Sequence, residues 1–554
     1  MNHPDRFLTH TVENQPPPLA GYDAYATDRP LREAVKREGG AWDEDRLRRM
    51  GGLAGGKLIE LGFAANQNKP ALRLFDRYGH RLDEVEFQPA YHRLMETGIA
   101  HGLHALPWRE PRAGAQVIRL ALYYLFAQAE QGADCPLTMT HASVPVLKAQ
   151  PEVAAEWLPR VLSLYYDPHP IPVANKLGAT IGMGMTEKQG GSDVRCNSTR
   201  ARALGARGPG RDYELVGHKW FLSAPMSDAF LVLAQAEGGL SCFLMPRILP
   251  DGTRNALRLQ RLKDKLGNWS NASCEAEFAG AHAVMIGEEG RGIATILEMV
   301  ALTRLDCIVG SAAIMRQALV QAIHHAHHRT AFGKRLVDQP LMQNVLADLA
   351  LESEAALALL LRIGRAVDES PYSEAAAAFA RVATPIGKYW VCRRAPAFIA
   401  EAQECLGGAG YVEDSILPRL YREAPLNSLW EGCGNIQCLD VLRALVKEPA
   451  ARDALFGELE AARGGHPALD RTIAELRRDL DQHDGIELRL RTIVERAALA
   501  LQASILLRAG PAAVAETFCA SRLDGHHGLA LGTLPARAPH AVLIERAWSA
   551  SYCS

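Results

Sequence analysis

The longest helical pattern in the chain most restricts the folds open to it. Residues 293–328 keep a helical spacing of apolar positions, and only Gly310 interrupts the segment, so it is long enough for one extended helix. Three more helical segments follow at 342–366, 374–406 and 436–447. Long helices with apolar faces pack against one another, so the sequence predicts a four-helix bundle over residues 286–447.

The spacing of apolar residues changes to that of strands between residues 179 and 285. Short apolar runs are separated there by turn residues, and no helical pattern lies between them. The runs are 213–216, 219–222, 230–234, 241–245, 257–262 and 272–278, and the Gly- and Pro-containing segment 203–211 is expected to be a loop. Successive strands without helices between them predict an antiparallel sandwich or barrel.

Further segments flank these two regions. Residues 61–178 show helical periodicity and are predicted to form an N-terminal helical domain. Residues 1–60 are rich in Pro and Gly and are expected to be irregular, as an extended arm on another part of the assembly or as a disordered tail. Residues 448–554 contain helical patterns at 476–480 and 486–507, which predict an additional helical domain. The expected fold class is therefore α+β.

The composition excludes several classes of protein. A chain of 554 residues is too long for one simple core, so several domains that share interfaces are expected. The formal net charge of −2 gives no overall positive field, so a nucleic-acid site would need a local patch. The eleven cysteines include no CxxC pair and match reduced thiols. Without a signal peptide or an apolar run of the ~20 residues that a membrane span needs, the expected location is cytoplasmic.

A glycine-rich stretch at residues 182–193 brings together glycines, hydroxyls and acidic side chains within a dozen positions. Glycine lets a backbone pass close to a planar or phosphorylated ligand, which hydroxyl and N–H groups can then hydrogen-bond. Taken alone, the stretch is equally compatible with an ordinary turn, because its spacing is not G-x-G-x-x-G. The surrounding motifs decide between the two readings.

Five motifs occur in a fixed order along the chain. They are 185–187 with 191–193 (M-T-E and G-S-D), 217–223 (G-H-K-W-F-L-S), 329–333 (R-T-A-F-G), 406–411 (L-G-G-A-G-Y) and 429–432 (L-W-E-G). On these motifs the chain resembles the acyl-CoA dehydrogenase superfamily of flavoproteins over about residues 60–447. The runs 188–194 and 261–268 look most similar to its AidB branch, which is associated with the response to DNA alkylation. The resemblance implies a helical domain, a β-domain and a four-helix bundle, in agreement with the periodicity.

The resemblance implies FAD as the cofactor. Thr186 and Ser192 match the residues that bind the flavin pyrimidine edge and a phosphate. Phe221, Leu222 and Ser223 match the segment lying against the ring, although plain strand core is the alternative for the first two. Arg329, Phe332 and Gln343 match positions through which a neighbouring subunit holds the other end of the dinucleotide, so a homotetramer (a dimer of dimers) is expected. The remaining cofactor positions are Met185, Gly191, Gly407, Gly408, Trp430 and Asn435.

Glu431 is the candidate catalytic base. In the family a carboxylate removes the α-proton of an acyl thioester while hydride leaves the β-carbon for the flavin. The alternative is that Glu431 serves as an acid at the N-terminus of the next helix. Trp430 and Arg304 are expected in the substrate pocket. The family usually has Tyr where Trp430 stands, and its CoA-binding F-D-x-x-R motif keeps only Arg304, so weak or vestigial turnover of acyl-CoA is expected.

Four histidines at 324, 325, 327 and 328 share helix faces, as metal ligands can. No Asp or Glu joins them in an H-E-x-x-H pattern, so a helix end at a surface or interface is expected and no metal.

Two functions remain open. The first is a DNA-associated flavoprotein of the alkylation response that binds double-stranded DNA. Its candidate contacts are the basic side chains Arg443, Lys447, Arg477 and Arg478, for which a solvated helix face is the alternative. The second is a conventional short- or branched-chain acyl-CoA dehydrogenase, or a related flavin oxidase, with no role at DNA.

Overall fold

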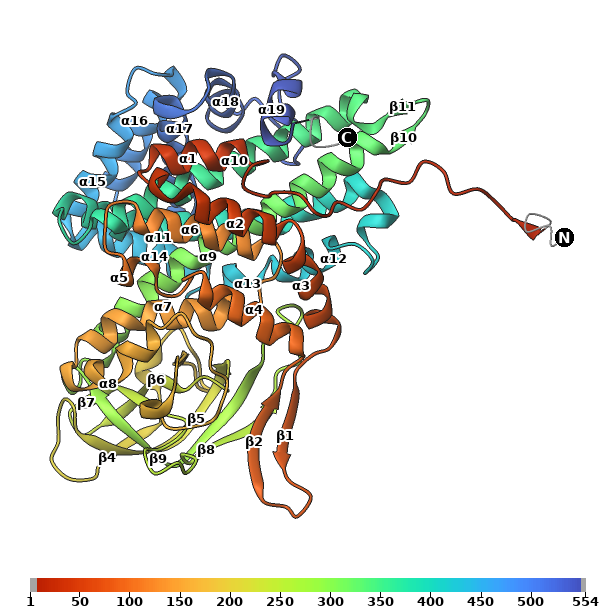
Figure 1. Ribbon diagram of the computed structural model, residues 1–554. Coiled ribbons are helices and arrows are strands. Elements are labelled where there is room, and N and C mark those ends of the chain that lie inside the picture. The colour runs from red at the N-terminus through yellow and green to blue at the C-terminus, as the bar shows by residue number, and fades with distance from the viewer. Residues whose placement is uncertain (1–6, 550–554) are drawn as a thin grey trace.

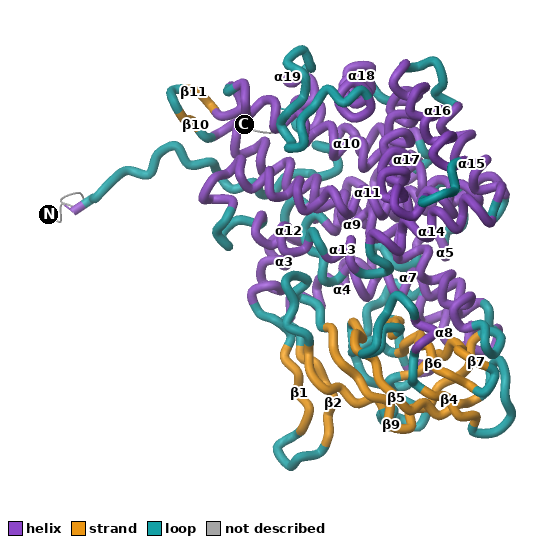
Figure 2. The backbone as a smooth tube through the Cα atoms, turned by 180° about the vertical axis from the view of Figure 1, so that it is seen from behind, coloured by secondary structure: helices purple, strands orange, loops and turns teal. Residues whose placement is uncertain are grey.

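Residues 7–549 are described by the computed structural model, and most of them are helical. The helices form one large body, and a strand-rich domain lies at one end of it with a two-stranded hairpin alongside (Figures 1 and 2). The predicted order of helical domain, β-domain and helical bundle is therefore confirmed.

The expectation of an irregular segment over residues 1–60 is wrong beyond residue 28. Residues 29–54 form α1 (Arg29–Arg37) and α2 (Glu44–Ala54). The Asp28 carboxylate accepts a hydrogen bond from the N–H of Leu31, and Asp43 accepts one from the N–H of Arg46, so each helix begins with an N-cap. Both capping residues can be recognised in the sequence, but the Gly and Pro content of the segment was given more weight. Of residues 7–28, the part nearest α1 lies along the bundle, and the part towards the N-terminus projects away from it (Figure 1).

The N-terminal helical domain also contains a hairpin that the sequence did not predict. It consists of β1 (Ala71–Phe75) and β2 (Arg81–Glu86), which pair antiparallel and project beside the β-domain (Figure 1). The helices around it are α3 (Lys57–Gln67), α4 (Pro89–Ala100), α5 (Leu106–Arg109), α6 (Ala115–Ala127), α7 (Asp134–Lys148) and α8 (Pro151–Val161).

Seven strands build the β-domain. They are β3 (Ile181–Gly184), β4 (Arg200–Ala203), β5 (Asp212–Ser223), β6 (Ala229–Ala236), β7 (Gly239–Pro246), β8 (Leu257–Leu262) and β9 (Ser273–Ile286). The pairings β6–β4–β5–β9–β7 return to β6, so the sheet closes on itself as a barrel, with β3 on β6 and β8 on β9. The two runs predicted around residue 218 are one strand, β5.

The predicted antiparallel β-domain is confirmed as a barrel, with parallel pairing at two places. β3 and β4, both four-residue strands without a predicted pattern, each pair parallel with β6. Parallel neighbours need a long connection, and residues 185–228 provide it by leading from β3 through β4 and β5 back to β6.

The four predicted bundle helices are present. They are α9 (Gly292–His328), α10 (Pro340–Glu369), α11 (Glu374–Leu406) and α14 (Gly434–Lys447). Shorter elements connect them, namely β10 (Thr330–Ala331), β11 (Lys334–Arg335), α12 (Leu417–Glu423) and α13 (Leu426–Leu429). Helix α9 passes Gly310 without a break. None of the helices in the described part of the chain has the length and apolar character required to cross a membrane.

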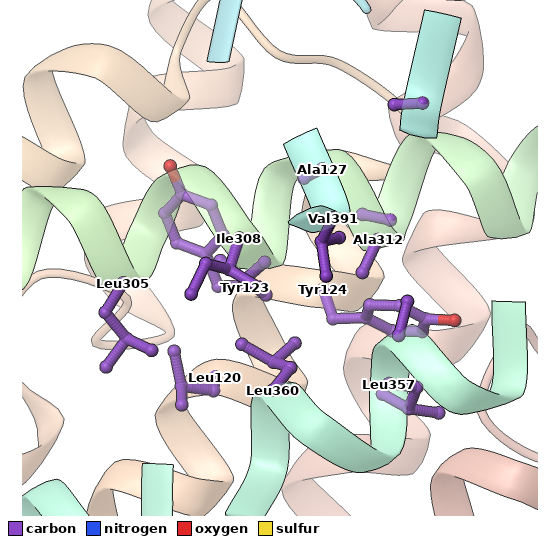
Figure 3. Close-up of a cluster of buried hydrophobic side chains, with 14 of the residues drawn as sticks. Leu120, Tyr123, Tyr124, Ala127, Leu305, Ile308, Ala312, Leu357, Leu360 and Val391 are labelled. Atoms are coloured by element: carbon purple, nitrogen blue, oxygen red, sulfur yellow. The ribbon is translucent and has the colours of Figure 1, made fainter. Parts of the chain in front are cut away.

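The core lies where α6 packs between α9 and α10. Every residue of α6 is buried. Figure 3 shows Leu120, Tyr123 and Tyr124 of α6 among apolar side chains of α9, α10 and α11. The Arg119 guanidinium and the Asp306 carboxylate form a buried ion pair of 2.6 Å that joins α6 to α9. Because the pair satisfies both charges inside the core, it fixes how α6 lies against α9.

Residues 448–549 form five helices that cover the bundle. They are α15 (Pro449–Glu460), α16 (Pro467–Asp481), α17 (Ile486–Ala509), α18 (Ala512–Phe518) and α19 (His540–Ala547). Helix α17 contacts α10, α11 and α14, and α19 contacts α10. The additional helical segment therefore packs on the bundle and does not stand apart from it.

Candidate active site

The glycine-rich loop after β3 is held in place by a buried ion pair. The Lys219 ammonium on β5 lies 2.8 Å from the Glu187 carboxylate, and both side chains are fully buried. The carboxylate also accepts hydrogen bonds from the N–H groups of Ser198 and Thr199. Burial opposes the charged carboxylate, but Lys219 and these hydrogen bonds outweigh burial and lower the pKa of Glu187 to about 2. Both residues stand inside motifs, yet the sequence analysis assigned neither of them a role.

A glycine keeps the backbone of this loop close to a hydroxyl group. A Cβ atom at Gly191 would meet the Thr186 hydroxyl oxygen at 2.4 Å, so only glycine fits beside that hydroxyl. Met185 and Thr186 are half-buried and Ser192 is exposed. The N–H of Trp220 donates to the Thr186 carbonyl at 2.8 Å, which ties the loop to the end of β5. The structure therefore places the four predicted loop residues beside the predicted β5 segment.

The side chains at the end of β5 alternate as a strand requires. Phe221 is half-exposed, and the Ser223 hydroxyl lies 3.1 Å from the Ser273 hydroxyl. Leu222 points the other way and is fully buried, where it would contact a Cβ atom placed at Gly184. The Leu222 side chain therefore takes the alternative of strand core, because the pleat turns it into the barrel, and its place in the cofactor site stays a prediction.

A lysine that the sequence analysis left without a role lies beside Ser223 and Ser273. The Lys265 ammonium donates to the Asn271 carbonyl at 2.7 Å and lies 3.4 Å from the Ser273 hydroxyl. Burial lowers the pKa of Lys265 to about 8. The residue is part of the run 261–268 that carried the resemblance, but only the fold shows that the run reaches this site.

Glu431 stands on a strained turn between α13 and α14. Its φ is +59°, a left-handed conformation that is uncommon for a residue other than glycine. The Arg304 guanidinium and the Gln437 amide each donate to the Glu431 carbonyl at 3.0 Å, and they hold the turn. The Lys388 ammonium donates to the carbonyls of Asn427 and Gly432 from the opposite side. The turn, and not a regular helix start, positions the carboxylate.

The carboxylate of Glu431 has one direct hydrogen bond, from the Thr303 hydroxyl at 2.8 Å. Burial raises the pKa of Glu431, and Thr303, Lys388 and Arg304 oppose that rise. A carboxylate with a raised pKa can accept a proton near neutral pH. Thr303 and Lys388 were missed by the sequence analysis because they lie far from Glu431 along the chain.

The two residues expected in the substrate pocket are already engaged. The Arg304 guanidinium forms an ion pair of 2.6 Å with Asp440, in addition to its bond to the Glu431 carbonyl. The Trp430 indole N–H donates to the Asn427 side chain at 2.9 Å, and its ring packs on an apolar cluster that includes Met139 and Met299. Arg304 therefore positions Glu431, and Trp430 keeps water from one side of it.

Two further predicted cofactor residues, Arg329 and Phe332, lie at another end of the molecule. Arg329 and Phe332 belong to the β10–β11 hairpin, which Figures 1 and 2 show far from the β-domain. Phe332 is 99% exposed, and its φ is +52°. Asn14 of the N-terminal arm bonds to the Thr330 backbone and to Arg329. Within one chain, Arg329 and Phe332 therefore lie far from Thr186 and Glu431. This separation is compatible with a site shared between two subunits.

Four more predicted cofactor positions have separate surroundings. Gln343 lies in the first turn of α10, next to that hairpin. Gly407 and Gly408 are exposed, and a Cβ atom at either would meet nothing within 4 Å. Asn435 is exposed at the start of α14, where its side-chain oxygen accepts a hydrogen bond of 2.9 Å from Arg491 of α17. The additional C-terminal helices therefore reach an expected cofactor contact.

The basic residues proposed for DNA lie on exposed helix faces. Arg443, Lys447 and Arg478 are exposed, and within residues 7–549 they form no ion pair. Arg477 is paired with Glu460 at 3.1 Å and lies over the Phe456 ring. Of the histidine group, His324 bonds to the Pro17 carbonyl and packs on His328. No group of three or more metal-binding side chains occurs in the described part of the chain.

Comparisons with known proteins agree with this geometry. Residues 14–168 match the family model of the adaptive response protein AidB N-terminal domain, 182–281 the acyl-CoA dehydrogenase middle domain and 290–446 the acyl-CoA dehydrogenase C-terminal domain. The chain is 48% identical over 526 residues to AidB of Escherichia coli (strain K12), which is named as an acyl-CoA dehydrogenase. The match covers 94% of this chain and 96% of that one.

Solved structures show the same fold. Caenorhabditis elegans ACDH-11 in complex with C11-CoA superposes with a TM-score of 0.83 and 25% identity over 99% of this chain and 93% of that chain. An acyl-CoA dehydrogenase complexed with FAD from Bacillus anthracis gives a TM-score of 0.65 at 18% identity, over 94% and 85% of the two chains. The chain therefore belongs to the AidB branch of the acyl-CoA dehydrogenase family and is an acyl-CoA dehydrogenase-type flavoenzyme.

Proposed function

We propose that this protein binds FAD and oxidises a small acyl thioester, with Glu431 as the catalytic base. The observation that carries the proposal is the pinned turn at Glu431, which holds one carboxylate of raised pKa beside Thr303. FAD, when bound, supplies the two-electron acceptor that takes hydride from the β-carbon of the substrate. Glu431 accepts the α-proton in the same reaction, and a carbon–carbon double bond forms between the two carbons.

The residues present fit FAD. Gly191 leaves the Thr186 hydroxyl open to a ligand, and Ser192 and Ser223 add hydroxyls to the same region. Phe332, exposed on its hairpin, would complete the site of a neighbouring subunit in a homotetramer, a dimer of dimers. Arg329 and Gln343 would hold the pyrophosphate end there, since a guanidinium matches phosphate oxygens in a paired arrangement.

Turnover of acyl-CoA by this site is weak. The positions of the CoA-binding Phe and Asp are held by Val300 and Ala301, and Arg304 is paired with Asp440. The CoA group therefore lacks two of its usual partners, while the base remains in place.

Anaerobic mixing with isovaleryl-CoA tests this function. The wild-type protein, purified with its flavin, should lose its visible flavin absorption slowly. The Glu431→Gln variant should keep the absorption, with a rate lower by about 10²–10⁴-fold, because an amide cannot accept the proton. A colourless purified protein, or equal bleaching in both proteins, would exclude the proposal.

We also propose that the protein binds double-stranded DNA in the cytoplasm as part of a response to alkylation. Support comes from the three exposed cations Arg443, Lys447 and Arg478, which lack acidic partners within residues 7–549, and from the match to AidB. Cations that release counterions from DNA give a binding constant that falls as salt is raised. The ten cysteines of the described chain are all free, which agrees with a cytoplasmic protein.

Duplex binding at several salt concentrations tests the second proposal. Replacing Arg443, Lys447 and Arg478 together by Ser should weaken binding and reduce its salt dependence. A matched variant with Arg202, Arg207 and Arg258 of the β-domain replaced by Ser removes the same charge elsewhere and should bind DNA like the wild type. If both variants lose affinity equally, or neither does, the surface is wrongly assigned. No duplex binding at any salt concentration would leave the conventional dehydrogenase alone.

A further inference from the structure

A cavity lies apart from the residues assigned to flavin and substrate. It has a volume of about 360 Å³ and lies between α4 with β2 on one side and the turn after β5 on the other. Its lining includes Phe87, Tyr91, His92, Tyr166, Ser227 and Arg247. None of the predicted cofactor or substrate residues lines it, although Ala224 at its wall directly follows Ser223.

Arg247 is the unusual group in this cavity. Its guanidinium donates to the Ser227 carbonyl at 3.1 Å, and within residues 7–549 it forms no ion pair. Burial lowers the pKa of the half-buried Arg247, and the charges of Asp228 and Glu84 oppose that shift. A cation partly removed from water is costly unless an anion pairs with it, and no carboxylate within residues 7–549 lies within salt-bridge distance of Arg247.

The carboxylates around the cavity are already engaged with other groups. Asp228 pairs with the buried Lys176 at 2.7 Å and accepts a hydrogen bond from the Thr180 N–H. Glu84 pairs with Arg254, Glu86 pairs with Arg73, and Asp167 bonds to the His169 ring and to the Leu177 N–H. The cavity is therefore not arranged to receive a cation.

The walls of the cavity are flat and aromatic. Phe87 and Tyr91 stack with ring centres 4.2 Å apart and an interplanar angle of 12°. The His92 ring stacks on Tyr166 at 5.9 Å, and its Nδ1 atom lies 2.9 Å from the Tyr166 hydroxyl. Burial lowers the pKa of His92, so this ring adds no positive charge near neutral pH. The Ser227 hydroxyl is buried and has no hydrogen-bond partner in the described chain.

We propose that this cavity binds a small organic acid with a planar apolar body, whose carboxylate pairs with Arg247 and the Ser227 hydroxyl. A guanidinium recognises a carboxylate through charged hydrogen bonds, and stacked rings receive a flat ligand between apolar surfaces. The Arg247 cation, the Ser227 hydroxyl and the aromatic walls would thereby all find partners in one molecule. The cavity is built largely by the N-terminal domain, in which the β1–β2 hairpin and α4 provide one wall.

Fluorine NMR with para-fluorobenzoate tests the proposal on the full-length protein. The wild type should show saturable binding of para-fluorobenzoate. The affinity for para-fluorobenzamide, which is neutral and of the same shape, should be lower by about tenfold, a difference of about 1.4 kcal/mol. The Arg247→Met variant should lose para-fluorobenzoate binding, and Arg202→Met on the barrel surface should not.

Because Arg247→Met removes a hydrogen bond to the Ser227 backbone, a second variant guards against a folding defect. Ser227→Ala removes only the unpartnered hydroxyl and should weaken para-fluorobenzoate binding while thermal unfolding stays unchanged. Equal binding of acid and amide, binding that survives both variants, or no binding of either probe would overturn the proposal. The test does not depend on flavin, so its outcome is separate from that of the dehydrogenase reaction.

Discussion

Glu431 is positioned through its backbone more than through its side chain. Arg304, Gln437 and Lys388 all bond to carbonyl groups of residues 427–432, whereas the carboxylate has Thr303 alone. A non-glycine residue at a φ of +59° costs free energy, and these bonds from three helices offset it. The backbone of Glu431 is thus held in place, while within residues 7–549 its carboxylate accepts a hydrogen bond from Thr303.

Lys388 should tune the pH dependence of the reaction. Its positive charge favours the ionised form of Glu431, so the Lys388→Met variant should raise the pKa of Glu431 further. Glu431 accepts a proton only when ionised, and the acidic limb of the rate profile should therefore move to higher pH. The rate of anaerobic flavin reduction, measured from acidic to alkaline pH, follows this limb. Lys388→Arg keeps the charge and should leave the limb near its wild-type position; an unmoved limb in Lys388→Met would contradict the assignment.

At the scale of elements, a buried ion pair connects the glycine-rich loop to β5. Glu187 of the loop and Lys219 of the strand are both fully buried, and together they satisfy each other and the loop N–H groups. Removing one partner of a buried pair leaves an uncompensated charge. The conformation of the glycine-rich loop therefore depends on Glu187 and Lys219, which are both buried.

The Lys219→Met variant should unfold more easily by about 3–5 kcal/mol in urea. The exposed pair between Lys57 and Glu60 is the matched control, and Lys57→Met should cost less than about 1 kcal/mol. A loss in Lys219→Met no larger than in Lys57→Met would show that the buried pair contributes little.

The same pair should give the wild type a defined acid sensitivity. Folding lowers the pKa of Glu187 from 4.5 to about 2, so its contribution to stability is fully present above pH 4.5. That contribution is lost as pH falls from 4.5 towards 2, because protonation then breaks the pair. Urea unfolding across this range should show a steeper loss of stability in the wild type than in the double variant Glu187→Gln, Lys219→Met. Parallel curves for the two proteins would argue against this source of acid sensitivity.

At the scale of the whole molecule, the predicted cofactor residues include two sets that lie at different ends of the folded structure. Thr186, Ser192 and Glu431 belong to one set, and Arg329 and Phe332 of the exposed β10–β11 hairpin belong to the other (Figure 1). The N-terminal arm supports the second set through Asn14. If both sets serve one flavin, each site consists of two subunits.

Hybrid oligomers test this arrangement. Gly191→Ala should weaken flavin binding because its methyl group meets the Thr186 hydroxyl, and Arg329→Ala should weaken it through the other set. When the two variants are co-expressed with different tags and purified as hybrids, each pair of subunits should contain one intact site and one doubly altered site. Flavin content should then recover to about half of the wild-type value. Hybrids no richer in flavin than either parent would contradict a shared site, and Gly205→Ala, which meets no atom, serves as the neutral control.

Local patterns were enough for most elements of the fold. The apolar spacing of α9 or of β6 recurs every turn or every second residue, so it can be recognised without knowing any partner. Helices α1 and α2 were missed although their Asp caps are local, because the Gly and Pro content of the segment was given more weight. Strands β3 and β4 could not be found in this way, since four-residue strands acquire their identity from the parallel neighbour β6.

The sequence by itself determined the order of the domains, the long helices and the motif residues that place the chain in its family, because each depends on neighbours within a few positions. Tertiary structure alone decided that Leu222 belongs to the core, that Arg304 holds the turn of Glu431, and that Thr303 and Lys388 set the environment of its carboxylate. It also decided that Arg247 lines an aromatic cavity with no counter-charge from residues 7–549 in salt-bridge range. These facts depend on residues far apart along the chain, and only packing brings such residues within hydrogen-bonding distance.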